Sequence, residues 1–260
     1  MCRCPQPFLG NNGELKPIYT LVPNRPAIEL VAYYSNFEWY YPECELQTKR
    51  WFVEHIQPDW VIFDAGANIG YYTILFSQLA PQGKVFAFEP TETIKLLQEN
   101  LDHHRCTNVI SLPLALGKVS GAIEDDIFRI WGEAPERQVY QFSTVDDVVA
   151  QLKLDRIDCM KIDVDSFDFE VLRGAEATLR RYDPWVVVEL TYALAKRNQS
   201  VPEALQWLYS LGYRHAHVLD HENYVVRRKE QLAAHEALPG MLLTFETRPL
   251  VTGGFKDGTG

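Results

Sequence analysis

Short apolar runs alternate with segments of helical spacing along the chain from Trp60 onward. Runs such as WVIFD and WVVVE are short and rich in β-branched and aromatic residues, so they predict buried strands. Between them, apolar residues recur every three or four positions, which predicts helices. The predicted strands are 60–64, 84–89, 108–112, 159–164, 185–191, 214–219 and 241–247, and the predicted helices are about 70–79, 92–103, 143–152 (capped by Ser143), 168–181 and 201–211.

This alternation predicts an α/β fold: a seven-stranded, mostly parallel sheet with helices on both faces, in a Rossmann-like arrangement. Two stretches interrupt it. Residues 113–142 predict two or three short strands with turns at 117–121 and 132–135, and residues 220–240 predict a charged excursion between the last two strands. Sheets of this kind bind ligands at the carboxyl ends of their parallel strands, so the chemistry is expected there.

The first 58 residues differ in pattern and predict an N-terminal arm and helix (1–58), ahead of a main domain at 59–250 and a flexible tail at 251–260. Residues 1–30 are rich in Pro, Gly and Asn, whereas 43–56 have helical spacing. Six aromatic side chains lie between them: Tyr33, Tyr34, Phe37, Trp39, Tyr40 and Tyr41. We favour their being anchors that hold the arm to the domain, with a lid over a ligand site as the alternative.

Composition narrows the class of partner. The 260 residues carry a net charge of −10, and duplex nucleic acid needs a basic face, so no nucleic-acid partner is expected. Five cysteines, an odd number, favour reduced thiols over a disulfide framework. No apolar run approaches the roughly 18 residues of a membrane-spanning helix. We therefore expect a cytoplasmic protein without membrane insertion, and no pattern indicates its oligomeric state.

The strongest candidate site is the stretch Val61–Thr73, VIFDAGANIGYYT, which predicts a strand, a glycine turn and the start of a helix. Gly66 and Gly70 let the backbone approach a ligand closely, and the helix N-terminus offers unpaired N–H groups. Glu89 ends the next strand, where an acidic side chain can accept both ribose hydroxyls of an adenosine. Together they predict a nucleotide-type cofactor site.

The spacing of this turn indicates the kind of cofactor. A dinucleotide-binding turn needs glycine at its first, third and sixth positions, and here those positions hold Gly66, Asn68 and Tyr71. Because the second glycine is the one that admits a pyrophosphate, its absence favours an adenosine compound without a diphosphate. An oxidoreductase that binds NAD or another nucleotide is the alternative.

Four motifs, in order along the chain, resemble the FkbM-type family of S-adenosylmethionine-dependent methyltransferases. They are DAGANIGYYT at 64–73, FEP at 88–90, STVDDV at 143–148 and KIDVDSFDFEVLRGA at 161–175. Each motif alone is a weak signal, but the four in register along one α/β pattern are a strong one. The resemblance covers about residues 45–192 and implies a class I methyltransferase fold.

The resemblance also implies where S-adenosyl-L-methionine would lie, over the ends of strands one, two and four. It assigns the methionine end of the cofactor to Asp64, Gly66, Asn68 and Gly70. It assigns the ribose to Glu89, and the surroundings of the adenine to the loop at 114–116, including Leu116. Asp163 would lie closest to the methyl group and the acceptor.

The expected reaction is O-methylation of a hydroxyl on a small molecule or glycan. An oxygen acceptor needs a base as it attacks, and we expect Asp163 or Asp165 in that role, assisted by Glu189. The two aspartates could instead bind Mg²⁺, which is not expected because no His accompanies them.

The fourth motif departs from the family's usual K-I-D-V-E-G-x-E. Asp165, Ser166 and Asp168 stand where the family has Glu, Gly and Glu. Because of this departure, a protein that binds the cofactor but has lost the transfer reaction is an alternative to an active methyltransferase. Asp168 and Glu170 are interpreted as charges that favour the N-terminus of the following helix.

Overall fold

The computed structural model describes residues 16–127, 137–220, 222–228 and 241–244. Its strands are β1 (Ile18–Thr20), β2 (Ile28–Leu30), β3 (Val61–Ala65), β4 (Lys84–Phe88), β5 (Val109–Leu112), β6 (Ala115–Leu116), β7 (Gly121–Asp125), β8 (Gln138–Ser143), β9 (Cys159–Ile162), β10 (Trp185–Glu189), β11 (His215–Leu219), β12 (Asn223–Val226) and β13 (Met241–Thr244). Its helices are α1 (Leu46–His55), α2 (Tyr71–Leu79), α3 (Ile94–His103), α4 (Val145–Gln151), α5 (Asp168–Arg173), α6 (Glu176–Tyr182) and α7 (Val201–Ser210), with 3-10 turns η1 (Ser35–Phe37) and η2 (Tyr192–Arg197). The predicted turn at 132–135 and tail at 251–260 lie outside the described residues.

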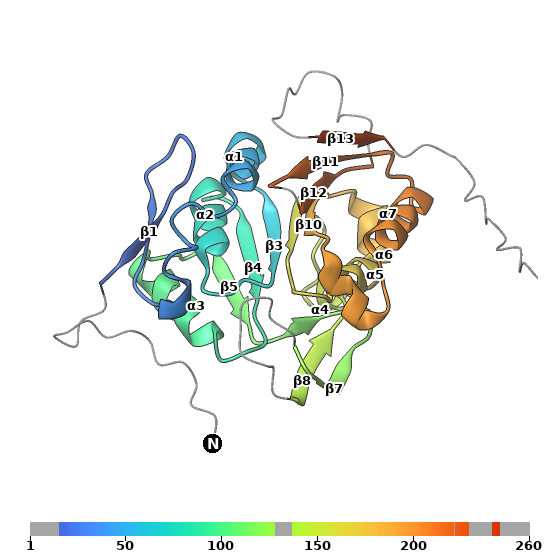
Figure 1. Ribbon diagram of the computed structural model, residues 1–260, viewed down its shortest axis with the longest axis horizontal. Helices are drawn as coiled ribbons and strands as arrows, with labels where there is room; N and C mark the ends of the chain where they lie inside the picture. The colour runs from blue at the N-terminus through green and yellow to red at the C-terminus, as the bar shows by residue number, and fades with distance from the viewer. Residues whose placement is uncertain (1–15, 128–136, 221, 229–240, 245–260) are drawn as a thin grey trace, which may run out of the picture.

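The main sheet has the strand order β13-β11-β12-β10-β9-β3-β4-β5 (Figure 1). The strands from β10 to β5 run parallel, whereas β12 is antiparallel to both of its neighbours, and β13 is antiparallel to β11. The prediction of a mostly parallel α/β sheet is confirmed. One detail was wrong: residues 223–226, expected in a charged excursion, form β12, an eighth strand between β10 and β11. The predicted last strand is β13, at the edge of the sheet.

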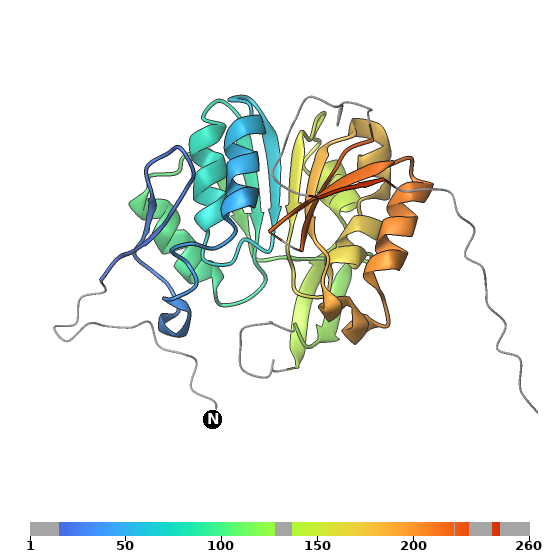
Figure 2. The same ribbon diagram turned by 45° about the horizontal axis from the view of Figure 1, so that its top comes forward.

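Helices cover both faces of the sheet (Figures 1 and 2). The apolar side chains of α1, α2 and α3 pack with one set of strand residues, which includes Ile62, Val85 and Val187. Those of α4, α5, α6 and α7 pack with the alternate set, which includes Phe63, Phe86 and Val188. Successive side chains of a strand point to opposite faces, so this division tells which face each polar strand residue occupies.

Two helix boundaries differ from the prediction for local reasons. The predicted helix 168–181 is two helices, because the chain turns at Gly174, where an added Cβ would lie 2.0 Å from the carbonyl oxygen of Gly117. The helix expected to be capped by Ser143 is capped by Thr144, whose hydroxyl accepts from the N–H of Asp147 at 2.9 Å. The insertion at 113–142 contains short strands as predicted, and β6, β7 and β8 form a separate small sheet.

The N-terminal segment packs on the α2 and α3 side of the sheet. The Asn100 side chain joins the two, accepting from the N–H groups of Val31 and Ala32 at 2.9 and 3.0 Å and donating to the carbonyl of Ile69 at 2.8 Å. Tyr33 and Tyr41 are buried as anchors, whereas Trp39 is 69% exposed. Within the described residues, no helix is long and apolar enough to cross a membrane.

Candidate active site

The turn after β3 lies against the ends of β4 and β9. Its backbone is left-handed at Gly66 (φ 81°), Asn68 (φ 49°) and Gly70 (φ 95°). The N–H groups of Gly66 and Ala67 both donate to the carbonyl of Phe88 at 3.0 Å, which fastens the turn to β4. A Cβ on Gly66 would lie 1.8 Å from the carbonyl oxygen of Asp163, so only glycine allows the turn and the end of β9 to approach this closely.

Glu89 lies directly beside this turn. Its carboxylate is buried and accepts from the N–H of Asn68 at 3.2 Å and from the N–H of Thr91 at 3.1 Å. The predicted methionine-binding turn and the predicted ribose-binding acid are therefore adjacent. The Thr91 hydroxyl also donates to this carboxylate at 2.5 Å, and together these contacts hold the carboxylate in one orientation.

Asp64 and Lys161 are neighbours in the centre of the sheet. They are register partners on the parallel strands β3 and β9, and both belong to the face covered by α1 and α2. Asp64 is fully buried, accepts from the Thr73 hydroxyl at 2.5 Å, and keeps its second oxygen, Oδ1, without a hydrogen-bond partner. Burial raises the pKa of Asp64, and the charge of Lys161 opposes this shift.

Lys161 also contacts Asp163, two residues further along. Its ammonium donates to the Asp163 carboxylate at 2.9 Å, and the lysine is 2% exposed whereas the aspartate is 26% exposed. Burial alone would lower the pKa of Lys161, but Asp163, Asp64 and Glu45 raise it above its ordinary value. A charged buried lysine therefore holds Asp163 at the carboxyl end of β9, with the aspartate reaching the surface.

Glu45 is a site residue that the sequence interpretation missed. It has φ 48° and precedes α1, whose first N–H groups, from Gln47 and Thr48, donate to the Asp220 carboxylate at 3.3 and 2.7 Å. The Glu45 carboxylate accepts from the Tyr71 hydroxyl at 2.6 Å and from the Asn223 amide at 2.9 Å. Burial, and after it the Asp163 carboxylate, raises the pKa of Glu45.

Glu189 completes this group. It pairs in register with Asn223, so it lies on the same face of the sheet as Lys161 and Asp64. Burial raises the pKa of Glu189, and the carboxylates of Asp163, Asp168, Glu45 and Asp165 raise it further. We call Glu45, Asp163 and Glu189 the acid group. It lies where β9 and β10 end, next to the glycine turn.

The family match coincides with this site. The family described as "Methyltransferase FkbM domain" matches residues 64–215, which begin at Asp64 and contain Glu89, Asp163 and Glu189. This match covers more than half of the chain. The protein belongs to the FkbM methyltransferase family.

Known relatives of this FkbM methyltransferase agree with the assignment. "Methyltransferase 1" of Beauveria bassiana is 26% identical over 195 residues, which are 64% of this chain and 76% of the relative. "Hexuronic acid methyltransferase AglP" of Haloferax volcanii is 30% identical over 148 residues, which are 54% of this chain and 60% of that protein. The crystal structure of an FkbM methyltransferase from Methylobacillus flagellatus superposes with a TM-score of 0.51 at 14% identity; the match covers 66% of this chain and 44% of that chain.

The loop after β9, where this FkbM methyltransferase departs from the usual motif, is left-handed at Asp165 (φ 50°) and Ser166 (φ 110°). Asp168 is buried and accepts from the N–H groups of Val164 and Ser166 at 2.8 and 3.0 Å, and its pKa is raised to about 6, mainly by burial. Asp168 therefore shapes the loop through specific contacts, beyond the charge effect that was expected.

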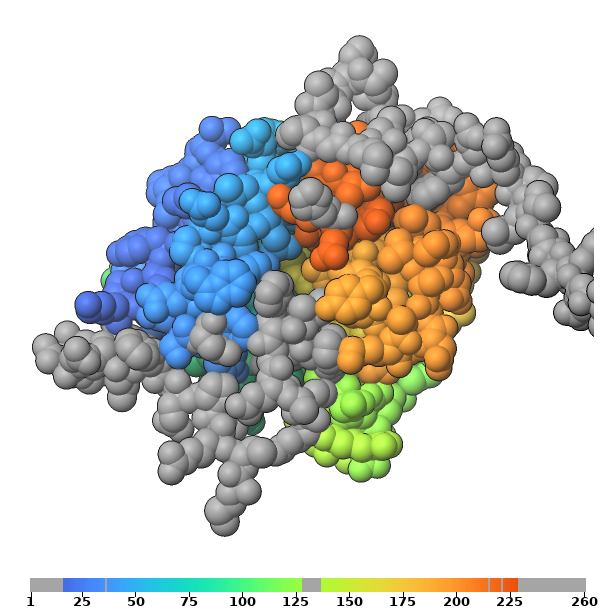
Figure 3. Space-filling model, in the orientation of Figure 1, coloured from blue at the N-terminus to red at the C-terminus, as the bar shows by residue number. Residues whose placement is uncertain are grey.

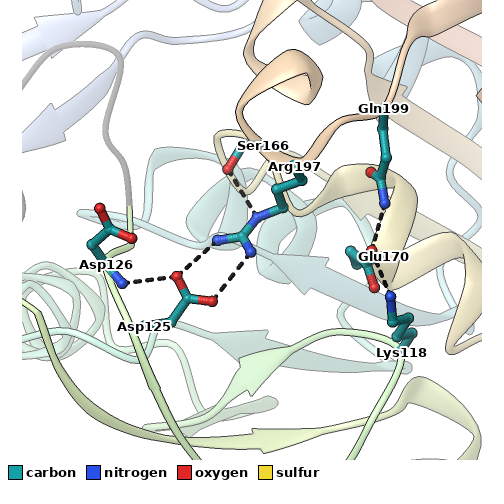
Figure 4. A network of polar contacts seen from close by, with 7 residues as sticks. All are labelled: Lys118, Asp125, Asp126, Ser166, Glu170, Arg197 and Gln199. Atoms are coloured by element: carbon teal, nitrogen blue, oxygen red, sulfur yellow. Dashed lines mark hydrogen bonds and ion pairs between the residues drawn. The ribbon is translucent and has the colours of Figure 1, made fainter.

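Arg197 from η2 braces the same loop from outside (Figure 4). Its guanidinium forms a two-pronged ion pair with Asp125 of β7 at 3.2 Å, donates to the Ser166 hydroxyl at 3.3 Å and lies over the ring of Phe167. Beside it, Glu170 accepts from Lys118 at 3.1 Å and from Gln199 at 2.5 Å. These contacts join the small sheet, the loop and η2.

We expect the Arg197–Asp125 pair to stabilise the fold measurably. Both side chains are mostly buried, at 20% and 23% exposure, and the pair is bidentate, so a double-mutant cycle of Arg197→Gln and Asp125→Asn should give a coupling of about 1–2 kcal/mol in urea unfolding. The exposed pair Arg180–Glu176, at 51% and 46% exposure, is the control and should give about 0.5 kcal/mol or less. Equal coupling free energies in the two cycles would show that the Arg197–Asp125 pair contributes no more to stability than an exposed ion pair.

Two further features concern the loop at 114–116 and a possible metal ion. Leu116 is 3% exposed and packs in the core, whereas Leu114 of the same loop is partly exposed, so Leu114 is better placed to meet a ligand. In the part of the chain that the structure describes, no group of three or more His, Cys, Asp and Glu side chains is arranged to hold a metal ion.

Proposed function

We propose that this FkbM methyltransferase transfers a methyl group from S-adenosyl-L-methionine to a hydroxyl oxygen of a small molecule or glycan. The observation that carries the proposal is the position of Asp163, whose backbone touches the glycine turn while its carboxylate, held by Lys161, reaches the surface. One residue thus borders both the expected cofactor and the expected acceptor. The similarity to the Haloferax relative, a hexuronic acid methyltransferase, supports a sugar-like acceptor.

The residues at the turn fit the proposed cofactor. Glu89 is oriented by the N–H groups of Asn68 and Thr91, and an acidic side chain at this strand end can bind the ribose hydroxyls. The left-handed turn at Gly66, Asn68 and Gly70 lies directly beside it. Asp64, two residues before Gly66, keeps one buried oxygen without a hydrogen-bond partner, and we assign that residue to the methionine end of the cofactor. When bound, the cofactor supplies an electrophilic methyl group on a sulfonium.

Asp163 is the residue we assign as the base. Lys161 donates to its carboxylate at 2.9 Å and so fixes its position, and a positioned carboxylate can accept the proton of an attacking hydroxyl. Glu45 and Glu189 lie beside Asp163, and burial, followed by the Asp163 carboxylate, raises the pKa of each, so we assign both to the border of the acceptor site. Asp165 borders the acid group and influences Glu189, and we give it a supporting role.

The proposal is tested by incubating the purified protein with S-adenosylmethionine labelled in its methyl group and a set of sugars and small alcohols. We expect label to appear in an acceptor, with the methyl group on oxygen when the product is examined by NMR. Transfer to nitrogen or carbon would contradict the oxygen assignment. Binding of the cofactor without transfer to any acceptor would favour the non-catalytic module.

Replacement of Glu89 with alanine should weaken binding of S-adenosylhomocysteine by about 10- to 100-fold, because the charged carboxylate makes hydrogen bonds worth about 1.5–3 kcal/mol. The measurement is calorimetric titration. Glu92→Ala is the matched control, since its side chain is 78% exposed and lies three residues away. If both variants bind alike, Glu89 does not contact the ribose.

A further inference from the structure

A row of three hydroxyl groups connects the N-terminal segment, residues 16–55, to Glu89. The Thr91 hydroxyl donates to the Glu89 carboxylate at 2.5 Å, and its oxygen lies 2.9 Å from the hydroxyl oxygen of Thr93. The Thr93 hydroxyl lies 2.8 Å from the hydroxyl of Tyr34, the residue that precedes η1. Tyr34 stands before the residues 64–215 that match the FkbM family. A segment outside that match therefore reaches the acid expected to bind the ribose.

The carboxylate at its end sets the direction of this hydroxyl row. A hydroxyl group has one proton, and Thr91 gives its proton to Glu89. The hydrogen bond between the two threonines therefore needs the proton of Thr93, and the bond between Thr93 and Tyr34 needs the proton of Tyr34. Hydrogen bonds that run in one direction polarise one another, so the Tyr34 hydroxyl strengthens the bond that Glu89 accepts.

The position of Thr93 indicates that its hydroxyl belongs to this row and not to the helix that follows. Thr93 directly precedes α3, where a threonine side chain commonly accepts from a backbone N–H of the first turn. Within the described residues, the Thr93 side chain makes no such bond. It is 1% exposed, and a buried hydroxyl needs hydrogen-bond partners, which Tyr34 and Thr91 supply.

The backbone just before Tyr34 is fixed to the glycine turn. The fully buried Asn100 accepts from the N–H groups of Val31 and Ala32. The same side chain donates to the carbonyl of Ile69, which belongs to the turn, at 2.8 Å. Figure 3 shows the N-terminal segment, in blue, at the surface of the molecule. Its inner side thus contacts both the turn and, through the hydroxyl row, Glu89.

We propose that Tyr34 is a positioning residue for the cofactor: acting through Thr93 and Thr91, its hydroxyl holds the Glu89 carboxylate in the orientation that receives the ribose. The N-terminal segment is then part of the cofactor site as well as a segment anchored to the domain. This inference rests on the proposed function, in which Glu89 binds the ribose.

The first test removes single hydroxyls and measures binding of S-adenosylhomocysteine to the full chain by calorimetric titration. Tyr34→Phe keeps the ring, which packs edge-to-face with Phe37 at 6.5 Å, and should weaken binding by about 3- to 10-fold, as for one lost neutral hydrogen bond. Thr93→Val should weaken it equally, whereas Thr93→Ser, which keeps the hydroxyl, should bind like the unmodified protein. Tyr33→Phe is the matched control, because the Tyr33 hydroxyl donates to the carbonyl of Lys16 at 2.7 Å, and its affinity should not change.

A double-mutant cycle distinguishes positioning from a merely structural role of Tyr34. If Tyr34 acts through Glu89, Tyr34→Phe should weaken binding in the unmodified protein and cause no further loss in a Glu89→Ala protein. Additive losses would overturn the proposal, and so would unchanged affinity of Tyr34→Phe. Failure of the proposed function is distinguishable, because the unmodified protein would then not bind S-adenosylhomocysteine.

Discussion

Replacement of Asp163 with asparagine is expected to lower kcat by about 10²- to 10⁴-fold, the usual contribution of a positioned general base. Asparagine has nearly the same shape and keeps an oxygen that can accept from Lys161, so the loop should keep its conformation. The lost property is the ability to take a proton. Cofactor affinity should change little, because the Asp163 group that touches the glycine turn is its backbone carbonyl.

The measurement is steady-state turnover with the acceptor found in the screen, together with calorimetric titration of S-adenosylhomocysteine. Asp102→Asn provides the control, since Asp102 is an exposed residue of α3. Turnover equal to that of the unmodified protein would remove Asp163 as the base. A loss of cofactor binding as large as the loss of turnover would mean that Asp163 holds the cofactor instead.

Replacement of Gly66 with alanine is expected to lower the free energy of unfolding by about 3 kcal/mol or more. The added Cβ would lie 1.8 Å from the Asp163 carbonyl oxygen, and the residue has φ 81°, so the substitution combines a backbone clash with a conformation that side chains rarely adopt. The clash can be relieved only by separating the turn from the end of β9. Turnover should therefore fall even in molecules that remain folded.

Gly121 offers a matched control for this effect. It also has a left-handed backbone (φ 133°), but an added Cβ there would meet no atom within 4 Å. Gly121→Ala should therefore cost only the conformational part, about 1–3 kcal/mol. Urea unfolding of both variants measures the difference. Equal stabilities would mean that the turn and β9 can move apart without cost.

Much of the sheet could be predicted because its signals are local. The runs around β3, β4, β9 and β10 are apolar and buried on both faces, as parallel strands are, and the helices between them have their own periodicity. β12 was missed because four residues in a charged stretch carry too little pattern. What makes NYVV a strand is pairing with β10 and β11, a long-range contact.

The site residues also fall into those that local sequence signals identify and those that only long-range contacts reveal. Gly66, Gly70 and Glu89 could be found from spacing, since a turn and the next strand end are close in sequence. Glu45 could not, because it reaches the site through contacts with Tyr71 and Asn223, and α1 is capped by Asp220, 173 residues beyond Gln47. Lys161 stood within a recognised motif, but its role follows only from the register that places it beside Asp64.

The central claim is that the turn after β3 holds S-adenosylmethionine. Calorimetric titration of the purified protein with S-adenosylmethionine, S-adenosylhomocysteine and NAD tests it most directly. The account predicts one site per chain, with micromolar affinity for both S-adenosyl compounds and no binding of NAD, because Asn68 and Tyr71 stand where a dinucleotide turn needs glycine. Binding of NAD, or no binding of S-adenosylmethionine at micromolar concentrations, would contradict it.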